Sequence, residues 1–376
     1  MFFSGNTMSR RHRTGAALLA ISAGVLLAAC KHSSNTTVTK GLWIANGTDV
    51  LEYIPSQMTG GVVNMAPHLV NMSGTLGAPQ GVTFDSAGNL WVMDPQATVN
   101  GKADTPALVK FSAAQLAALG TTNNPDPVAV ITSTSFAFPQ QSVFDAAGNQ
   151  WVTDHNNNSV LVFTAAQLAA TGTNATVPAV VITSAAFNGP LGIVFDSMGN
   201  LWVANNGEVP GNNNTTSPIG TTIVEFAKAN LPTPGNGMVT PELTPSITLS
   251  DNGAGSIQGP WELQFDSAGN LWSSNAATPF TLVEFAKANL MATAAPTPMT
   301  TISPVTDMGN PSLDNTNGLC FDNLGDVAAT NAANAFGIPF YKAPLKTGAI
   351  TPSTFIIGAA TTLNAPAGCN WGPLVK

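Results

Sequence analysis

Polar side chains recur in this chain at positions where they could bind a metal ion or a small ligand. One set directly follows short apolar segments, most of which contain a Trp. A second set lies at the start of other short apolar segments, most of which begin with Pro. Carboxylate and amide oxygens are the ligands that calcium and magnesium prefer. The first set consists of Asn46, Asp94, Asp154, His155, Asn205, Asn206, Asn275 and Asn331, and the second is represented by Gln141, Trp261, Glu262 and Asn317.

Two chemical roles follow from these residue types. Glu262, Asp154 and Asn317 are the candidate ligands of a divalent metal, and His155 and Glu262 are the candidate catalytic residues. A polar, water-filled channel, with Asp and Asn only making turns and His155 a solvated loop residue, is the open alternative. Contacts to a bound ligand are expected from Gln141, Asp154, Asn205, Trp261 and Asn275.

A repeated segment must position these residues. The sequence FDSAGNLWV at 84–92 returns at 144–152, 195–203 and 265–273, and in a divergent form at 321–329. Recurrence at intervals of 51 to 70 residues indicates a repeat architecture. Each copy predicts two strands joined by a tight turn, in which Asp bonds the local backbone and Gly tolerates the left-handed conformation. The Asp residues of these copies are therefore expected to make turns and not to bind ligands.

Two further strand-like segments follow each copy, so a unit has four antiparallel strands, as in a propeller blade. Five complete blades begin near residues 77, 136, 187, 257 and 313. Residues 41–75 lack a first strand, and residues 363–376 contain only a first strand. We therefore predict an all-β, six-bladed propeller over 41–376, closed by the C-terminal strand. The candidate site residues should then gather on one face around the central channel, opposite the FDSAGN turns.

The N-terminus has the features of an export signal. Three Arg residues precede an apolar run from Gly15 to Ala29, which is short for a membrane span. The run ends in Leu-Ala-Ala-Cys, and this tetrapeptide resembles the lipobox of bacterial lipoproteins. The resemblance implies a signal peptide at 1–29, lipidation of Cys30, a polar tether at 30–40 and anchoring in a membrane. An ordinary signal peptide with a chance Cys is the alternative. By resemblance to sorting signals, Lys31 implies the outer membrane, facing the periplasm or the cell surface.

Composition excludes one class of partner. The chain has 12 basic and 20 acidic residues, and removal of the signal peptide would make its net charge more negative than −8. Nucleic-acid binding requires a basic face, so no nucleic-acid partner is expected.

Cys320 and Cys369 both lie on predicted first strands, in blades that become neighbours if the ring closes. Their side chains could meet between the two blades and form a disulfide in an oxidising compartment. They could also point away from each other and act as two small buried apolar residues.

The segment GPLGIVFDSMGNLWVAN at 189–205 resembles NHL-repeat propellers and the related gluconolactonase and streptogramin lyase families. The resemblance implies the fold for nearly the whole mature chain, but its members include enzymes and binding scaffolds. Gluconolactonases bind a divalent metal near the tops of the inner strands, and of the residues at the corresponding places only Asn317 fits. Streptogramin lyases use a His and a metal-linked Glu, for which this chain offers His155 and Glu262.

Our leading hypothesis is a lipid-anchored envelope propeller that binds a small molecule, a glycan or a protein partner at its channel face. The alternative is a calcium- or magnesium-dependent hydrolase or lyase of the gluconolactonase or streptogramin lyase type. The Asn-rich insertion at 207–220 should overhang the same face, as a recognition loop or as flexible decoration.

Overall fold

The computed structural model describes residues 40–119, 122–207, 220–235, 237–307, 310–333 and 336–374. The predicted signal peptide, nearly all of the tether and most of the insertion at 207–220 lie outside these ranges. Among the described residues, no helix is both long and apolar enough to cross a membrane.

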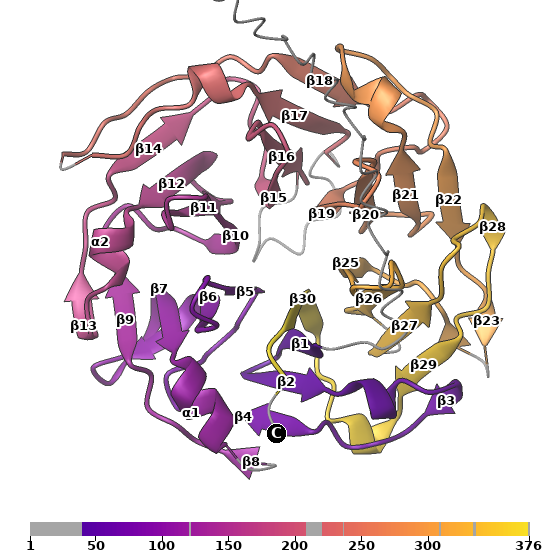
Figure 1. The fold of residues 1–376 in the computed structure, drawn as a ribbon, viewed down its shortest axis with the longest axis horizontal. Helices are drawn as coiled ribbons and strands as arrows, with labels where there is room; N and C mark the ends of the chain where they lie inside the picture. Colours follow the sequence, from indigo (N-terminus) through magenta and orange to yellow (C-terminus); the bar gives the residue numbers. More distant parts are fainter. Residues whose placement is uncertain are drawn as a thin grey trace, which may run out of the picture. The chain divides into compact units, whose positions relative to one another are not determined.

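The described strands form a ring of six blades, which confirms the predicted six-bladed propeller (Figure 1). Each blade has four antiparallel strands that run outward from the centre. The inner strands are β30 (Pro366–Gly372), β5 (Gly81–Phe84), β10 (Pro139–Phe144), β15 (Pro190–Phe195), β19 (Pro260–Phe265) and β25 (Thr316–Phe321). The second strands are β1 (Gly41–Asn46), β6 (Leu90–Val99), β11 (Gln150–Asp154), β16 (Leu201–Asn205), β20 (Leu271–Asn275) and β26 (Val327–Asn331).

The outer half of each blade follows the same order. The third strands are β2 (Asp49–Tyr53), β7 (Lys102–Phe111), β12 (Ser159–Phe163), β17 (Thr222–Phe226), β21 (Leu282–Phe285) and β27 (Gly337–Tyr341). The fourth strands are β4 (Leu69–Asn71), β9 (Ala129–Thr132), β14 (Val180–Thr183), β18 (Ile247–Ser250), β22 (Thr300–Ser303) and β29 (Thr354–Ile357). Short helices follow some third strands, namely α1 (Ala113–Ala118), α2 (Ala165–Leu168), η2 (Lys228–Asn230) and η3 (Lys287–Leu290).

The outer edge of every blade is covered, a feature that the sequence did not predict. The chain that leaves the third strand of one blade pairs in parallel with the fourth strand of the preceding blade. The covering strands are β3 (Gly61–Val63) on β29, β8 (Thr122–Asn123) on β4, β13 (Gly172–Ala175) on β9 and β28 (Gly348–Ala349) on β22. Isolated parallel bridges from Val239, Glu242 and Ala294 cover β14 and β18. Unpaired edges, which could template aggregation, are thereby removed.

The repeated turns behave as predicted. The Asp85 carboxylate accepts hydrogen bonds from the backbone N–H groups of Ala87 and Asn89 and from the side chains of Asn89 and Trp91. The same pattern occurs at Asp145, Asp196 and Asp266. These carboxylates hold the hairpin together and leave their Trp oriented for packing between blades.

Five blade junctions share an aromatic contact in which the Trp of one second strand meets the Phe that ends the next inner strand. The ring centroids lie 5.4–6.3 Å apart, in tilted or T-shaped pairs that are favourable for aromatic rings. The pairs are Trp43–Phe84, Trp91–Phe144, Trp151–Phe195, Trp202–Phe265 and Trp272–Phe321.

The sixth junction, where the ring closes, is built differently. Ala328 occupies the place of the Trp, and Trp371 of β30 packs instead against Phe340. A disulfide joins Cys320 of β25 to Cys369 of β30, so the two thiols do meet between neighbouring blades. β30 also pairs with β1, and the two ends of the chain therefore form one blade, as predicted.

Candidate functional site

The Asp or Asn residue three positions after the Trp, or its equivalent, in each second strand has a structural role in every blade. Asp154 is fully buried, and its two carboxylate oxygens accept the backbone N–H groups of Ala137 and Phe138 at 2.7 Å. These two residues lead into the inner strand of the same blade. Because both oxygens are engaged, Asp154 does not present a free carboxylate to the channel.

The same device recurs around the ring. In five blades, Oδ1 of this Asp or Asn accepts a hydrogen bond from the backbone N–H of a residue 16 or 17 positions earlier in the chain. In the blade that joins the two termini, the donor is the backbone N–H of Asn364. The amide nitrogens of Asn205 and Asn275 donate to carbonyl oxygens of the same segments. The side chains involved are Asn46, Asp94, Asp154, Asn205, Asn275 and Asn331. Asp154, Asn205 and Asn275, which were predicted to contact a ligand, thus have their polar atoms engaged in holding the inner strands in place.

His155 is buried, with 2% of its surface exposed, and so it is not the solvated loop residue of the alternative interpretation. Its Nδ1 lies 3.2 Å from Asn156 Oδ1, and its Nε2 has no hydrogen-bond partner. Burial lowers the pKa of the imidazole to about 4, against a smaller opposing effect from Asn156. The ring is therefore neutral at pH 7, and its low basicity makes it a poor general base.

The residues expected to bind a metal are not assembled into a metal centre. Within the described ranges, no group of three or more His, Cys, Asp and Glu side chains could hold a metal ion. Asp154 is occupied by backbone N–H groups, and Glu262 and Asn317 alone supply too few ligands for calcium. The predicted set of Glu262, Asp154 and Asn317 does not fit a divalent cation.

The inner strands contain a bulge at the channel. The pairing register between first and second strands shifts just after the first residue of β10, β15, β19 and β25. Bulges of this kind re-aim side chains at the rims of closed sheets. Hydroxyl groups of Thr153, Ser274 and Thr330 accept the N–H of the third residue of their own inner strand and donate to a carbonyl of the next blade.

Four of the six blades have Gly at the position aligned with Gln141 and Glu262, namely Gly81, Gly192, Gly318 and Gly368, because neighbouring inner strands approach closely there. A Cβ at Gly192 or Gly318 would overlap the backbone of the following blade. The two exceptions are Gln141 and Glu262. Gln141 Nε2 donates to Gln80 O at 3.4 Å and occupies the space that a Cβ at Gly368 would need. Gln141, which was predicted to contact a ligand, therefore already bridges two blades.

Glu262 is the most perturbed carboxyl at the channel. Its Oε2 is buried and has no hydrogen-bond partner. Burial raises the pKa of the carboxyl to about 8, although the backbone N–H groups of Cys369 and Leu319 oppose the shift. Glu262 thus reaches from β19 past β25 to β30. Both exceptions to the Gly pattern converge on residues 368 and 369 of the closing strand.

Buried polar atoms without a partner occur at the second and third residues of β10, β19 and β25. They are Gln140 Oε1, Trp261 Nε1, Asn317 Oδ1 and Glu262 Oε2, and all four are buried without a hydrogen bond. Gln80 occupies the same position as Gln140 but donates to Ala78 O. Three of these four residues were predicted site residues. Gln140 was missed, because sequence comparison singled out only its neighbour Gln141 as a departure from Gly.

Comparison with known proteins identifies the fold but no family. No protein-family model and no curated protein matches the sequence. Among solved structures, a protein of unknown function from Bacteroides caccae superimposes with a TM-score of 0.55 at 8% identity, covering 89% of this chain and 99% of that one. A structure of a nidogen/laminin complex superimposes with a TM-score of 0.52 at 13% identity, covering 89% of this chain and 98% of that one. A putative 6-phosphogluconolactonase from Bacteroides fragilis superimposes with a TM-score of 0.51 at 13% identity, covering 87% of this chain and 84% of that one. At such identities these similarities show the six-bladed propeller and no shared activity.

Proposed function

We propose that this chain is a lipid-anchored envelope propeller that binds a small polyhydroxylated molecule, such as a sugar, at its channel mouth. The observation that carries the proposal is the group of buried, unpartnered polar atoms on the inner strands. Each such atom costs about 1–3 kcal/mol when it has no partner. Buried polar groups are nearly always satisfied, so these four atoms favour an occupant that supplies hydrogen bonds.

The chemistry of the four atoms indicates the type of occupant. Gln140 Oε1 and Asn317 Oδ1 are acceptors, Trp261 Nε1 is a donor, and Glu262 can donate while it is protonated. Hydroxyl groups both donate and accept, and can therefore satisfy all of these atoms. The half-buried indole of Trp261 adds an apolar surface with a polar edge, which suits a sugar ring.

Binding can be tested with a panel of monosaccharides and disaccharides by thermal melting and calorimetry. A ligand should raise the melting temperature of the wild-type protein. Gln140→Leu and Trp261→Phe should each lower the affinity at least tenfold, because each removes one hydrogen-bonding group while keeping an apolar side chain. Gln80→Leu is the matched control, since Gln80 Nε2 donates to Ala78 O and no atom of Gln80 is both buried and unpartnered, and it should leave affinity unchanged. Affinity that is equal in all four proteins would contradict the proposal.

The metal-dependent hydrolase or lyase is distinguished in the same assay. Melting is repeated with EDTA, calcium and magnesium in the absence of sugar. Because the ligand set does not fit a divalent cation, we expect no shift. A metal-dependent rise that is abolished by Glu262→Gln would instead support the enzymatic alternative.

The anchor is a proposal that rests on the Leu-Ala-Ala-Cys segment at 27–30. We expect the full chain to partition with membranes when it is expressed in a bacterium, and the Cys30→Ser variant to be released from them. Mass spectrometry of the mature N-terminus provides the direct measurement. Recovery of the variant in the membrane fraction at wild-type levels would rule out this anchor.

A further inference from the structure

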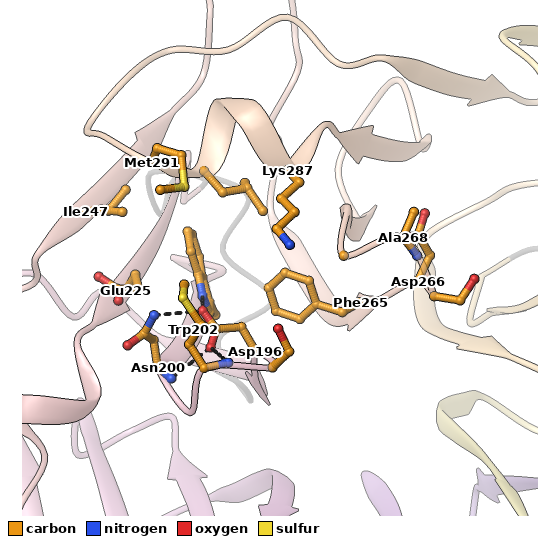
Figure 2. A pocket seen from close by; sticks show the side chains of 15 residues that line it. Asp196, Asn200, Trp202, Glu225, Ile247, Phe265, Asp266, Ala268, Lys287 and Met291 are labelled. Atoms are coloured by element: carbon orange, nitrogen blue, oxygen red, sulfur yellow. Dashed lines mark hydrogen bonds between the residues drawn. The ribbon is translucent and has the colours of Figure 1, made fainter. Parts of the chain in front are cut away.

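A pocket of about 260 Å³ lies between blades 4 and 5 on the face of the FDSAGN turns, away from the channel mouth (Figure 2). The turns at 196–199 and 266–269 line it, which places it on this face. Its apolar walls come from Trp202 and Phe265, together with Ile247, Leu290 and Met291. Met291 is 67% exposed, so the apolar wall extends to the surface. The sequence did not predict a site here, because the turns were assigned a structural role.

One wall of the pocket contains a buried carboxyl with one unpartnered oxygen. Glu225, on β17, is 3% exposed, and its Oε2 has no hydrogen-bond partner. Burial and the nearby Asp196 raise the pKa of this carboxyl, against a smaller opposing effect from a hydrogen bond with the Ser246 side chain. Asp196 itself is held by the turn, with Asn200 and Trp202 on one oxygen. Figure 2 shows Lys287 on the other side of Trp202 from Glu225, and no ion pair links the two within the described part of the chain.

The equivalent junction between blades 2 and 3 contains a cation. There the residue paired with the Trp is Lys110, in the register Trp91↔Lys110, whereas in blade 4 the register is Trp202↔Glu225. Lys110 Nζ lies 4.8 Å from the centre of the Trp91 ring and donates to Leu168 O. The residue that corresponds to Leu168 is Leu290, which lines the pocket.

We propose that the pocket between blades 4 and 5 binds an alkylammonium group. The cation would lie against the Trp202 indole and pair with Glu225, as the ammonium of Lys110 lies over Trp91 within the chain. Cation–π attraction and a partly desolvated carboxylate both favour a cation, and the apolar walls contact its alkyl chain. This site is separate from the channel mouth, and its test does not depend on the sugar proposal.

The test uses n-hexylammonium as the probe and n-hexanol as the neutral analogue, with affinity measured by calorimetry on the full chain. We expect hexylammonium to bind at least tenfold more tightly than hexanol. Glu225→Gln should reduce hexylammonium affinity about tenfold, because the charge is lost while the shape is kept. Glu284→Gln is the matched control: Glu284 occupies the equivalent position in blade 5, where Asn270 already satisfies it, and this variant should bind as the wild type does.

A second variant protects the test against a folding defect. Glu225→Lys recreates the arrangement of Lys110 and Trp91, which the fold already tolerates, and should abolish binding by filling the pocket with its own ammonium. N-acetyl-lysine methylamide distinguishes the source of the group. If it binds as tightly as hexylammonium, a lysine side chain of a protein is the natural ligand; if only hexylammonium binds, a free amine is. Equal binding of hexanol, or unchanged affinity in a folded Glu225→Gln variant, would overturn the proposal.

Discussion

Deletion of the chain from Pro366 onward is expected to abolish cooperative folding. This segment contains β30, the inner strand of the blade formed by both ends of the chain. Its loss exposes the edge of β1 and the neighbouring faces of β5 and β25. It also removes the packing of Trp371 on Phe340, the hydrogen bond from Gly368 N to Gln80 O, and the bond from Trp43 Nε1 to Pro373 O.

The measurement is urea unfolding followed by near-ultraviolet circular dichroism, since the Trp residues report packing between blades. The truncated protein should show no sharp transition and should aggregate through its open edges. The control is the double variant Cys320→Ala, Cys369→Ala, which keeps β30 and removes only the disulfide. We expect that variant to unfold cooperatively, with a free energy of unfolding lower by about 2–5 kcal/mol. A truncated protein with the stability of the double variant would show that the disulfide, and not the strand, closes the ring.

Substitution of Glu262 by Gln is expected to stabilise the protein at alkaline pH and to have little effect at acidic pH. The folded-state pKa of this carboxyl is about 8, and its ordinary value is 4.5. Below pH 4.5 the carboxyl is neutral in both the folded and the unfolded states. Between these two values the unfolded chain ionises first, so the wild-type protein loses stability as pH rises, and the loss is complete above about pH 8.

The advantage of the Gln variant should therefore grow between pH 4.5 and pH 8, reaching on the order of 4 kcal/mol. The measurement is the free energy of unfolding of both proteins at several pH values, so that all other titrating groups cancel in the difference. His155→Gln is the control with the opposite sign. Its imidazole pKa is lowered to about 4, so the wild type should lose stability relative to this variant as pH falls from 6.5. A pH-independent difference between wild type and Glu262→Gln would show that the carboxyl is hydrated at the channel.

Much of the fold could be predicted because its signals are local or are repeated. The turn at 85–88 is stabilised by bonds from Asp85 to residues two to six positions away, and the copies at 144–152, 195–203 and 265–273 carry the same Asp, Asn and Trp. The missing strand at one end and the surplus strand at the other indicated how the ring closes. The fifth, parallel strands were missed because they are only two to four residues long and pair with another blade.

The candidate site was harder to predict, because a buried side chain is defined by its partners. Asp154 and Asn205 had the residue types of a ligand set, yet the fold engages them with backbone groups of the loops before β10 and β15. Glu262 and Trp261 were identified because they depart from the repeat. Gln140 and Gln80 are identical in type and position, but Gln140 Oε1 is buried without a partner, whereas the Gln80 amide donates to Ala78 O and has no buried unpartnered atom.

The sequence by itself determined the blade, the number of blades and the order in which the strands close the ring. These properties depend on turns, alternation and repeat length, which short stretches of chain encode. Only the tertiary structure decided which polar atoms remain unsatisfied and where a pocket opens. Glu225 and Lys110 occupy equivalent places, and it is the packing of the next blade that leaves one beside a cavity and the other over an indole. Hydrogen-bond satisfaction and cavity shape are set by atoms from distant parts of the chain, so they appear only when the blades are assembled.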